Sequence, residues 1–103
     1  MTDRFFVLVD DQREYKNMDV TARNYRAAIP ALRDNPVTHL LIDNDLGNKK
    51  DGYDILVWAR DNDRMPTHVF IVSANPVARG RMEALLEHDM KYVHAPEDRK
   101  SVV

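Results

Sequence analysis

Short runs of consecutive apolar residues, each followed at once by polar residues, recur along the chain. The clearest cover residues 5–9, 40–42 and 69–72, and each is shorter than a typical helix. An unbroken apolar run predicts a strand that is covered on both faces, as in a parallel sheet packed against helices. Two weaker strands are predicted at residues 18–22 and 91–94, the former with the polar half that suits a sheet edge.

The segments between these strands have the apolar spacing of helices. Residues 25–32 place apolar side chains at intervals of three and four after Asn24, a residue type that often caps a helix, although Pro30 should bend this helix. Residues 53–60 have the same spacing. A third helix over residues 76–88 is predicted by the cap Asn75 and by Pro76 at its first position.

The resulting order, β β α β α β α β, predicts an α/β fold with a mainly parallel sheet between helical layers. Residues 11–17 are too few for a helical crossover, so the helix that would normally join the first two strands is missing. An antiparallel second strand would leave the following helix at the wrong end of the sheet. We therefore expect a parallel edge strand that is reached by an extended crossover.

Composition limits the classes of function. The chain has 103 residues, of which 44% are apolar, so we expect a single domain over residues 1–103. Its net charge of −2 does not favour duplex nucleic acid or an anionic membrane as a partner. No apolar run approaches the roughly 20 residues that span a bilayer, no signal peptide is evident, and the absence of cysteine suits a cytoplasmic protein.

Polar side chains with useful chemistry follow the predicted strands. Because the carboxyl ends of parallel strands meet at one edge of the sheet, we expect these side chains to gather there. We assign them three roles: metal ligands Asp10, Asp11 and Asp43; catalytic residues Asp43, Asp45 and His94; and phosphate-binding residues Ser73, Asn75, Arg79 and Arg81.

Physical reasons support these assignments. Neighbouring carboxylates repel one another unless a cation lies between them, and Mg²⁺ binds carboxylates together with water and phosphate oxygens. A hydroxyl, a helix N-terminus and arginines are suitable partners for a phosphate. Aspartate and asparagine after strands are also ordinary turn and cap residues. A calcium-binding loop running from Asp43 to Asp54 is a weaker interpretation, because Asn48 stands where that loop requires glycine.

Three motifs resemble the receiver domains of two-component signalling. They are Val7-Leu-Val-Asp10-Asp11, Leu40-Leu-Ile-Asp43 and Phe70-Ile-Val-Ser73. The resemblance implies a flavodoxin-like fold with five strands in the order 2-1-3-4-5. This chain departs from it in the missing first helix and in a last helix that is short or absent. The resemblance also implies that Asp43 is the phosphoacceptor, that Asp10 and Asp11 are Mg²⁺ ligands, and that Ser73 is the switch hydroxyl. Receiver domains have a lysine before a proline on the last strand. In this chain the residue before Pro96 is Ala95.

A closer resemblance is to cyclic-phosphate processing receiver domains. It rests on Val9-Asp-Asp-Gln-Arg13, on Ile42-Asp-Asn-Asp-Leu-Gly47 and above all on Ser73-Ala-Asn-Pro-Val-Ala-Arg79. The family pattern has histidines where this chain has Asn44 and Val72. Since histidine suits proton transfer near neutral pH, both replacements should weaken acid-base catalysis.

Two functions follow as hypotheses. The first is a Mg²⁺-dependent phosphoesterase that processes cyclic or terminal phosphate esters of nucleotides or RNA ends. The second is a non-catalytic receiver that senses a phosphate ligand or binds a protein partner. The acidic cluster and the resemblance favour the first, whereas Asn44, Val72 and Ala95 favour the second.

Overall fold

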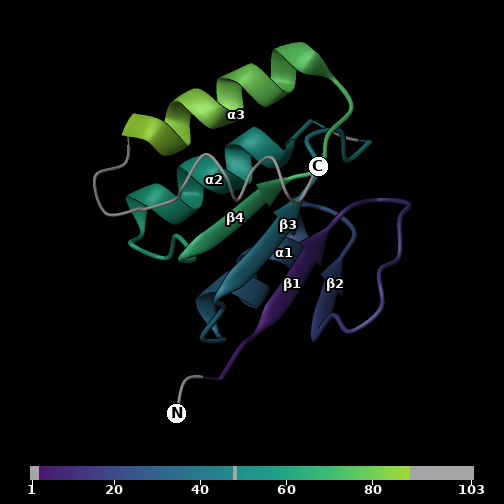
Figure 1. Ribbon diagram of the computed structural model, residues 1–103, viewed down its shortest axis with the longest axis vertical. Helices are drawn as coiled ribbons and strands as arrows, with labels where there is room; N and C mark the ends of the chain where they lie inside the picture. Colours follow the sequence, from purple (N-terminus) through teal and green to yellow (C-terminus); the bar gives the residue numbers. More distant parts are fainter. Residues whose placement is uncertain (1–2, 48, 89–103) are drawn as a thin grey trace.

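A computed structural model describes residues 3–47 and 49–88 of the chain (Figure 1). In this part of the chain, four parallel strands form one sheet in the order β2-β1-β3-β4, accompanied by three helices. The strands are β1 (Phe6–Val9), β2 (Val20–Ala22), β3 (His39–Ile42) and β4 (His68–Ile71), and the helices are α1 (Tyr25–Arg33), α2 (Gly52–Asp61) and α3 (Pro76–His88). All seven elements were predicted, with ends that differ by one or two residues. The strand predicted at 91–94 lies outside the described residues.

The edge strand β2 runs parallel to β1, as the placement of the following helix predicted. Val7 pairs with Val20, and the chain between the two strands contains no helix. The pairing extends beyond the strands at both ends, because Asp19 N donates to Phe6 O (2.8 Å) and Asp10 N donates to Ala22 O (3.0 Å). The helix that joins the first two strands in receiver domains is therefore absent here, as predicted, and a segment without a helix joins β1 to β2.

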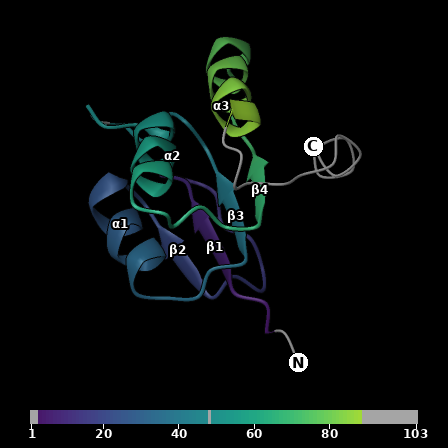
Figure 2. The same cartoon turned by 90° about the vertical axis from the view of Figure 1, so that its left-hand side faces the viewer.

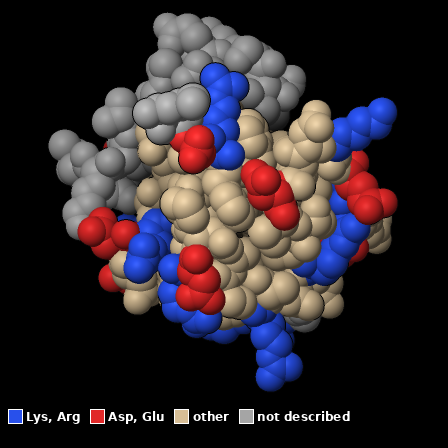
Figure 3. Space-filling view, turned by 90° about the horizontal axis from the view of Figure 1, so that it is seen from below, with Lys and Arg blue, Asp and Glu red and all other residues tan. Residues whose placement is uncertain are grey.

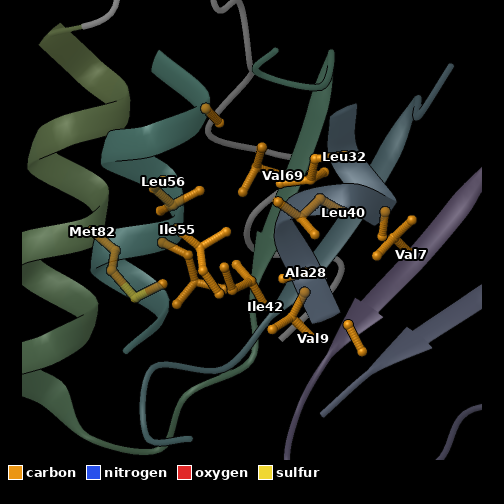
Figure 4. Close-up of a cluster of buried hydrophobic side chains, with 14 of the residues drawn as sticks. Val7, Val9, Ala28, Leu32, Leu40, Ile42, Ile55, Leu56, Val69 and Met82 are labelled. Atoms are coloured by element: carbon orange, nitrogen blue, oxygen red, sulfur yellow. The ribbon is translucent and has the colours of Figure 1, made fainter. Parts of the chain in front are cut away.

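The three helices pack against one face of the sheet (Figure 2). Side chains alternate along each strand, and those that join the helices in the core are Val7, Val9, Leu40, Ile42, Val69 and Ile71. They meet Leu32 of α1, Ile55 and Leu56 of α2, and Met82 of α3 (Figure 4). The described residues thus form two of the three layers that were expected.

Polar side chains determine where each helix begins. The side chain of Asn24 accepts from Ala27 N at the start of α1, which continues through Pro30 to Arg33. Asp51 and Asp54 form a reciprocal capping box at the start of α2. Oδ1 of Asn75 accepts from the first free backbone N–H groups of α3. The caps predicted at Asn24 and Asn75 are therefore confirmed.

The amino-terminal ends of the strands carry a row of stacked rings. Phe6, His39 and His68 are register partners on β1, β3 and β4, and adjacent ring centroids are 4.4 Å apart. These histidines lie at the end of the sheet opposite the predicted site, as expected from their positions at the strand starts.

The molecular surface carries both signs of charge. On the face shown in Figure 3, acidic and basic side chains are scattered among uncharged residues. Among residues 3–47 and 49–88, no helix combines the length and the apolar character needed to cross a membrane.

Candidate metal centre

Three aspartates meet at the carboxyl edge of the sheet. Asp10 and Asp43 directly follow β1 and β3, whose last residues Val9 and Ile42 are register partners, and Asp43 N donates to Val9 O (2.9 Å). One carboxylate oxygen each of Asp10, Asp11 and Asp43 lies within 4.8 Å of the other two. The predicted convergence of these three side chains is confirmed, and the arrangement could hold a metal ion.

Asp10 is the most deeply buried member of this aspartate cluster, with only 1% of its surface exposed. Its Oδ1 accepts from the backbone N–H groups of Gln12 (2.9 Å) and Arg13 (2.8 Å), and its Oδ2 accepts from Nη1 of Arg13 (3.1 Å). A buried carboxylate needs such donors to offset the loss of hydration. Asp10 is thus fixed in one orientation by the turn that follows it.

Asp43 lies in an environment that disfavours its charge. Burial raises the pKa of the Asp43 carboxyl, and the neighbouring Asp10 and Asp11 carboxylates raise it further. The Asn44 amide, which donates to Oδ1 of Asp43 (2.8 Å), and the Arg13 guanidinium act in the opposite direction. A divalent cation would relieve this repulsion, and an all-oxygen donor set suits Mg²⁺ or Mn²⁺. The residues therefore fit the metal that the sequence predicted.

The backbone beside Asp43 is clamped to the start of α2. Gly52 N donates to Asn44 O (2.8 Å), and Tyr53 N donates to Oδ1 of Asn44 (3.1 Å). A Cβ atom at Gly52 would lie only 2.2 Å from Asp43 O, so only glycine allows this approach. Asn44 thus has a structural role here, and neither this role nor that of Gly52 was recognised from the sequence.

Asp45 is not a member of the aspartate cluster. It is exposed, and its Oδ1 accepts from Gly47 N (3.2 Å), which closes a turn in which Gly47 has φ of 76°. Asp51 and Asp54, the last acidic positions of the calcium-loop interpretation, bond to each other's backbone in the capping box of α2. These contacts argue against a calcium loop here.

Ser73 and Asn75 organise the turn between β4 and α3. Ser73 is buried, with 4% of its surface exposed, and its Oγ accepts from Asn75 N (3.1 Å). Asn75 caps α3 through its side-chain oxygen. Both residues have the turn and cap functions that were the alternative to phosphate binding, and their role toward a phosphate stays a prediction.

The two arginines of α3 are engaged in contacts within the protein. Nη1 of Arg79 donates to Ile71 O (2.8 Å) and Ser73 O (3.2 Å), while the guanidinium of Arg81 lies over the Tyr53 ring, 4.2 Å from its centroid. Arg79 thereby supports the end of β4 next to Ser73. His94, the remaining predicted site residue, lies outside the described residues.

Arg13 is a further member of the site that was given no role from the sequence. Its Nη1 lies 3.1 Å from Oδ2 of Asp10, 3.0 Å from Val72 O and 4.0 Å from Oδ2 of Asp43. Nη1 of Arg23 holds the same turn, donating to Asp10 O (3.2 Å) and Arg13 O (2.7 Å). The spacing of three residues between Asp10 and Arg13 was the available signal, since it suits contact within one turn.

Comparisons with known proteins agree with this geometry. Residues 5–88 match a family model described as the cyclic-phosphate processing receiver domain. A comparison with curated proteins finds no match. The matched range contains every described strand and helix and all three members of the aspartate cluster.

Proposed function

Because the chain belongs to the cyclic-phosphate processing receiver domain family, we propose that its acidic edge processes phosphate esters with the help of a divalent cation. The substrates would be cyclic or terminal phosphate esters of nucleotides or of RNA ends. The observation that carries the proposal is the convergence of Asp10, Asp11 and Asp43, with oxygens within 4.8 Å of one another.

The aspartate cluster would hold the cation. When bound, Mg²⁺ would neutralise charge on the phosphate and lower the pKa of a bound water. Asp10 is suited to fixed coordination because its backbone and Arg13 donors orient it, while Asp11 and Asp43 are only partly buried and remain accessible from the edge. A phosphate bound at this edge would lie between the acidic loops and the turn at Ser73.

Residues around the cluster would position the substrate. The Ser73 hydroxyl and the Nδ2 amide of Asn75 would be neutral donors for phosphate oxygens, because the first free backbone N–H groups of α3 already donate to Oδ1 of Asn75. Arg79 holds the backbone on either side of Val72, so its contribution is to shape this turn. Asp45, which is exposed on the loop after β3, would accept a proton from solvent or from a hydroxyl of the substrate.

A second candidate function, a non-catalytic sensor of phosphate ligands or a protein-interaction module, is favoured by a specific observation. The Asn44 side chain is engaged with Tyr53 N, and in the described part of the chain His39 and His68 begin their strands at the opposite edge. The described acidic edge therefore lacks an imidazole for proton transfer. A sensor would need the cation and the phosphate site without turnover.

Hydrolysis of 2′,3′-cyclic nucleotides tests the first function. We expect Mg²⁺-dependent release of the nucleotide monophosphate by the wild-type protein and its loss in Asp43→Ala. The control is Asp61→Ala, which removes an exposed carboxylate that pairs with Arg60 on α2. Binding of the cyclic nucleotide without turnover would favour the sensor, and no turnover with any cyclic phosphate would contradict the enzymatic function.

A further inference from the structure

The Arg13 guanidinium lies beside two members of the aspartate cluster and joins the residues that follow β1 and β4. It donates to Asp10 after β1 (3.1 Å) and to Val72 O after β4 (3.0 Å), and it lies 4.0 Å from the carboxylate of Asp43 after β3. A positive charge thus already partly offsets the repulsion among the three carboxylates.

We propose that Arg13 is a resident counter-cation that competes with a divalent metal ion for the aspartate cluster. Metal binding would displace its guanidinium and release the Val72 carbonyl beside Ser73, so that Arg13 both sets the metal affinity and links the metal site to the phosphate side. This inference rests on the proposed metal binding.

The surroundings of Arg13 allow its side chain to leave. The side chain is 42% exposed, whereas that of Asp10 is 2% exposed, so the arginine is the partner that can move into solvent. A divalent cation and a guanidinium cannot share the same carboxylate oxygens without strong mutual repulsion. Binding of the cation therefore favours the outward position of Arg13.

The backbone of Arg13 is held independently of its side chain. Its N–H donates to Oδ1 of Asp10 (2.8 Å), and its carbonyl accepts from Nη1 of Arg23 (2.7 Å). The turn that orients Asp10 can thus persist when the guanidinium leaves. The Arg13 guanidinium can therefore be displaced without changing the orientation of Asp10, the candidate metal ligand.

Two arginines hold three consecutive carbonyls at the end of β4. Arg79 binds Ile71 O and Ser73 O, and Arg13 binds Val72 O between them. Displacement of Arg13 would therefore release only the middle carbonyl, which precedes the Ser73 hydroxyl. We therefore expect a local structural change at Ser73 when the cation binds to the aspartate cluster.

Isothermal titration calorimetry with MgCl₂ tests this competition directly. The variant is Arg13→Gln, and the matched control is Arg33→Gln, which removes an equal charge from an exposed ion pair with Asp34 at the end of α1. We expect Arg13→Gln to bind Mg²⁺ about tenfold more tightly than the wild-type protein, the equivalent of one charge-assisted hydrogen bond. The control should bind like the wild type, and far-UV circular dichroism should show that both variants are folded.

Amide NMR supplies a second readout that a purely structural role would not change. Mg²⁺ should shift the Ser73 amide in the wild-type protein, and this shift should shrink in Arg13→Gln, while the shifts of Asp11 and Asn44 persist. Arg13→Lys, which keeps the charge without the planar fork, should give an intermediate Mg²⁺ affinity.

The outcomes separate this inference from the proposed function. Equal or weaker Mg²⁺ binding by Arg13→Gln and Arg13→Lys would overturn the competition and identify Arg13 as a residue that positions Asp10, with the metal site itself intact. Absence of Mg²⁺ binding in the wild-type protein and in both variants would overturn the metal site and, with it, the inference.

Discussion

Replacement of Gly52 by alanine is the substitution that probes most directly how the candidate site is built. Gly52 is the first residue of α2, and an added Cβ would lie 2.2 Å from Asp43 O, 2.9 Å from Asn44 Cα and 3.0 Å from Asp43 C. All three are backbone atoms, so no side chain can rotate away to make room. Two of them belong to the residue that supplies a candidate metal ligand.

The expected magnitude follows from these contacts. Restoring even the 3.0 Å lower limit requires the start of α2 and the end of β3 to separate by at least 0.8 Å, the difference from 2.2 Å. Such a shift stretches the bonds from Gly52 N and Tyr53 N to Asn44. Overpacking and weakened hydrogen bonds together should cost roughly 2–4 kcal/mol. The melting temperature should fall by roughly 10–25 °C for a domain of this size.

Thermal and urea denaturation followed by far-UV circular dichroism measure this effect, and Gly80→Ala is the matched control. Gly80 lies inside α3, and a Cβ there would meet nothing within 4 Å, so alanine should stabilise the protein by roughly 0.5–1 kcal/mol. Mg²⁺ affinity should fall in Gly52→Ala and stay unchanged in Gly80→Ala. A Gly52→Ala protein as stable as the wild type would refute the argument that this contact is obligatory.

Three further predictions concern stability. Asp43→Asn should raise the metal-free free energy of unfolding at pH 7, because it removes a carboxylate whose pKa is raised by burial. The folded wild-type protein holds the Asp43 proton more tightly than the unfolded chain does, so the stability difference between Asp43→Asn and the wild type should shrink as the pH falls toward about 4. An Asp43→Asn protein that unfolds more easily than the wild type at pH 7 would count against this. Burial and the nearby His68 lower the pKa of His39, so the unfolded state takes up protons first and stability should decline as the pH falls below about 6.5. Denaturation between pH 7.5 and 5.5 should show a smaller decline in His39→Gln, and an equal decline would exclude His39 as the cause. Ile42→Ala should cost roughly 2–5 kcal/mol in urea denaturation because Ile42 is fully buried, whereas Val77→Ala at a position that is 72% exposed should cost less than about 0.5 kcal/mol; similar losses would contradict the described core.

The sheet could be predicted because its signals are local or depend on simple lengths. Unbroken apolar runs marked β1, β3 and β4, and the seven-residue segment 11–17 left no room for a helix before β2. The aspartates after β1 and β3 could then be placed together, because neighbouring parallel strands end at the same edge. That inference needed only the order of the strands.

Contacts between distant segments could not be predicted in the same way. The pairing of Arg13 with Val72 O joins residues 59 positions apart, and nothing in the spacing of either segment marks it. Gly52 resembled an ordinary loop glycine until its distance to Asp43 O was known. Asp45 was assigned to the site because it follows the same strand, and its place there stays a prediction; its contact with Gly47 N depends on the turn that follows.

The location of a bound metal ion tests the central claim most directly. Crystals grown with MnCl₂ and measured near the manganese absorption edge would show the ion by its anomalous scattering. We predict a peak about 2.1 Å from an oxygen of each of Asp10, Asp11 and Asp43. Manganese bound elsewhere, with these three carboxylates contacting only protein and water, would contradict the account.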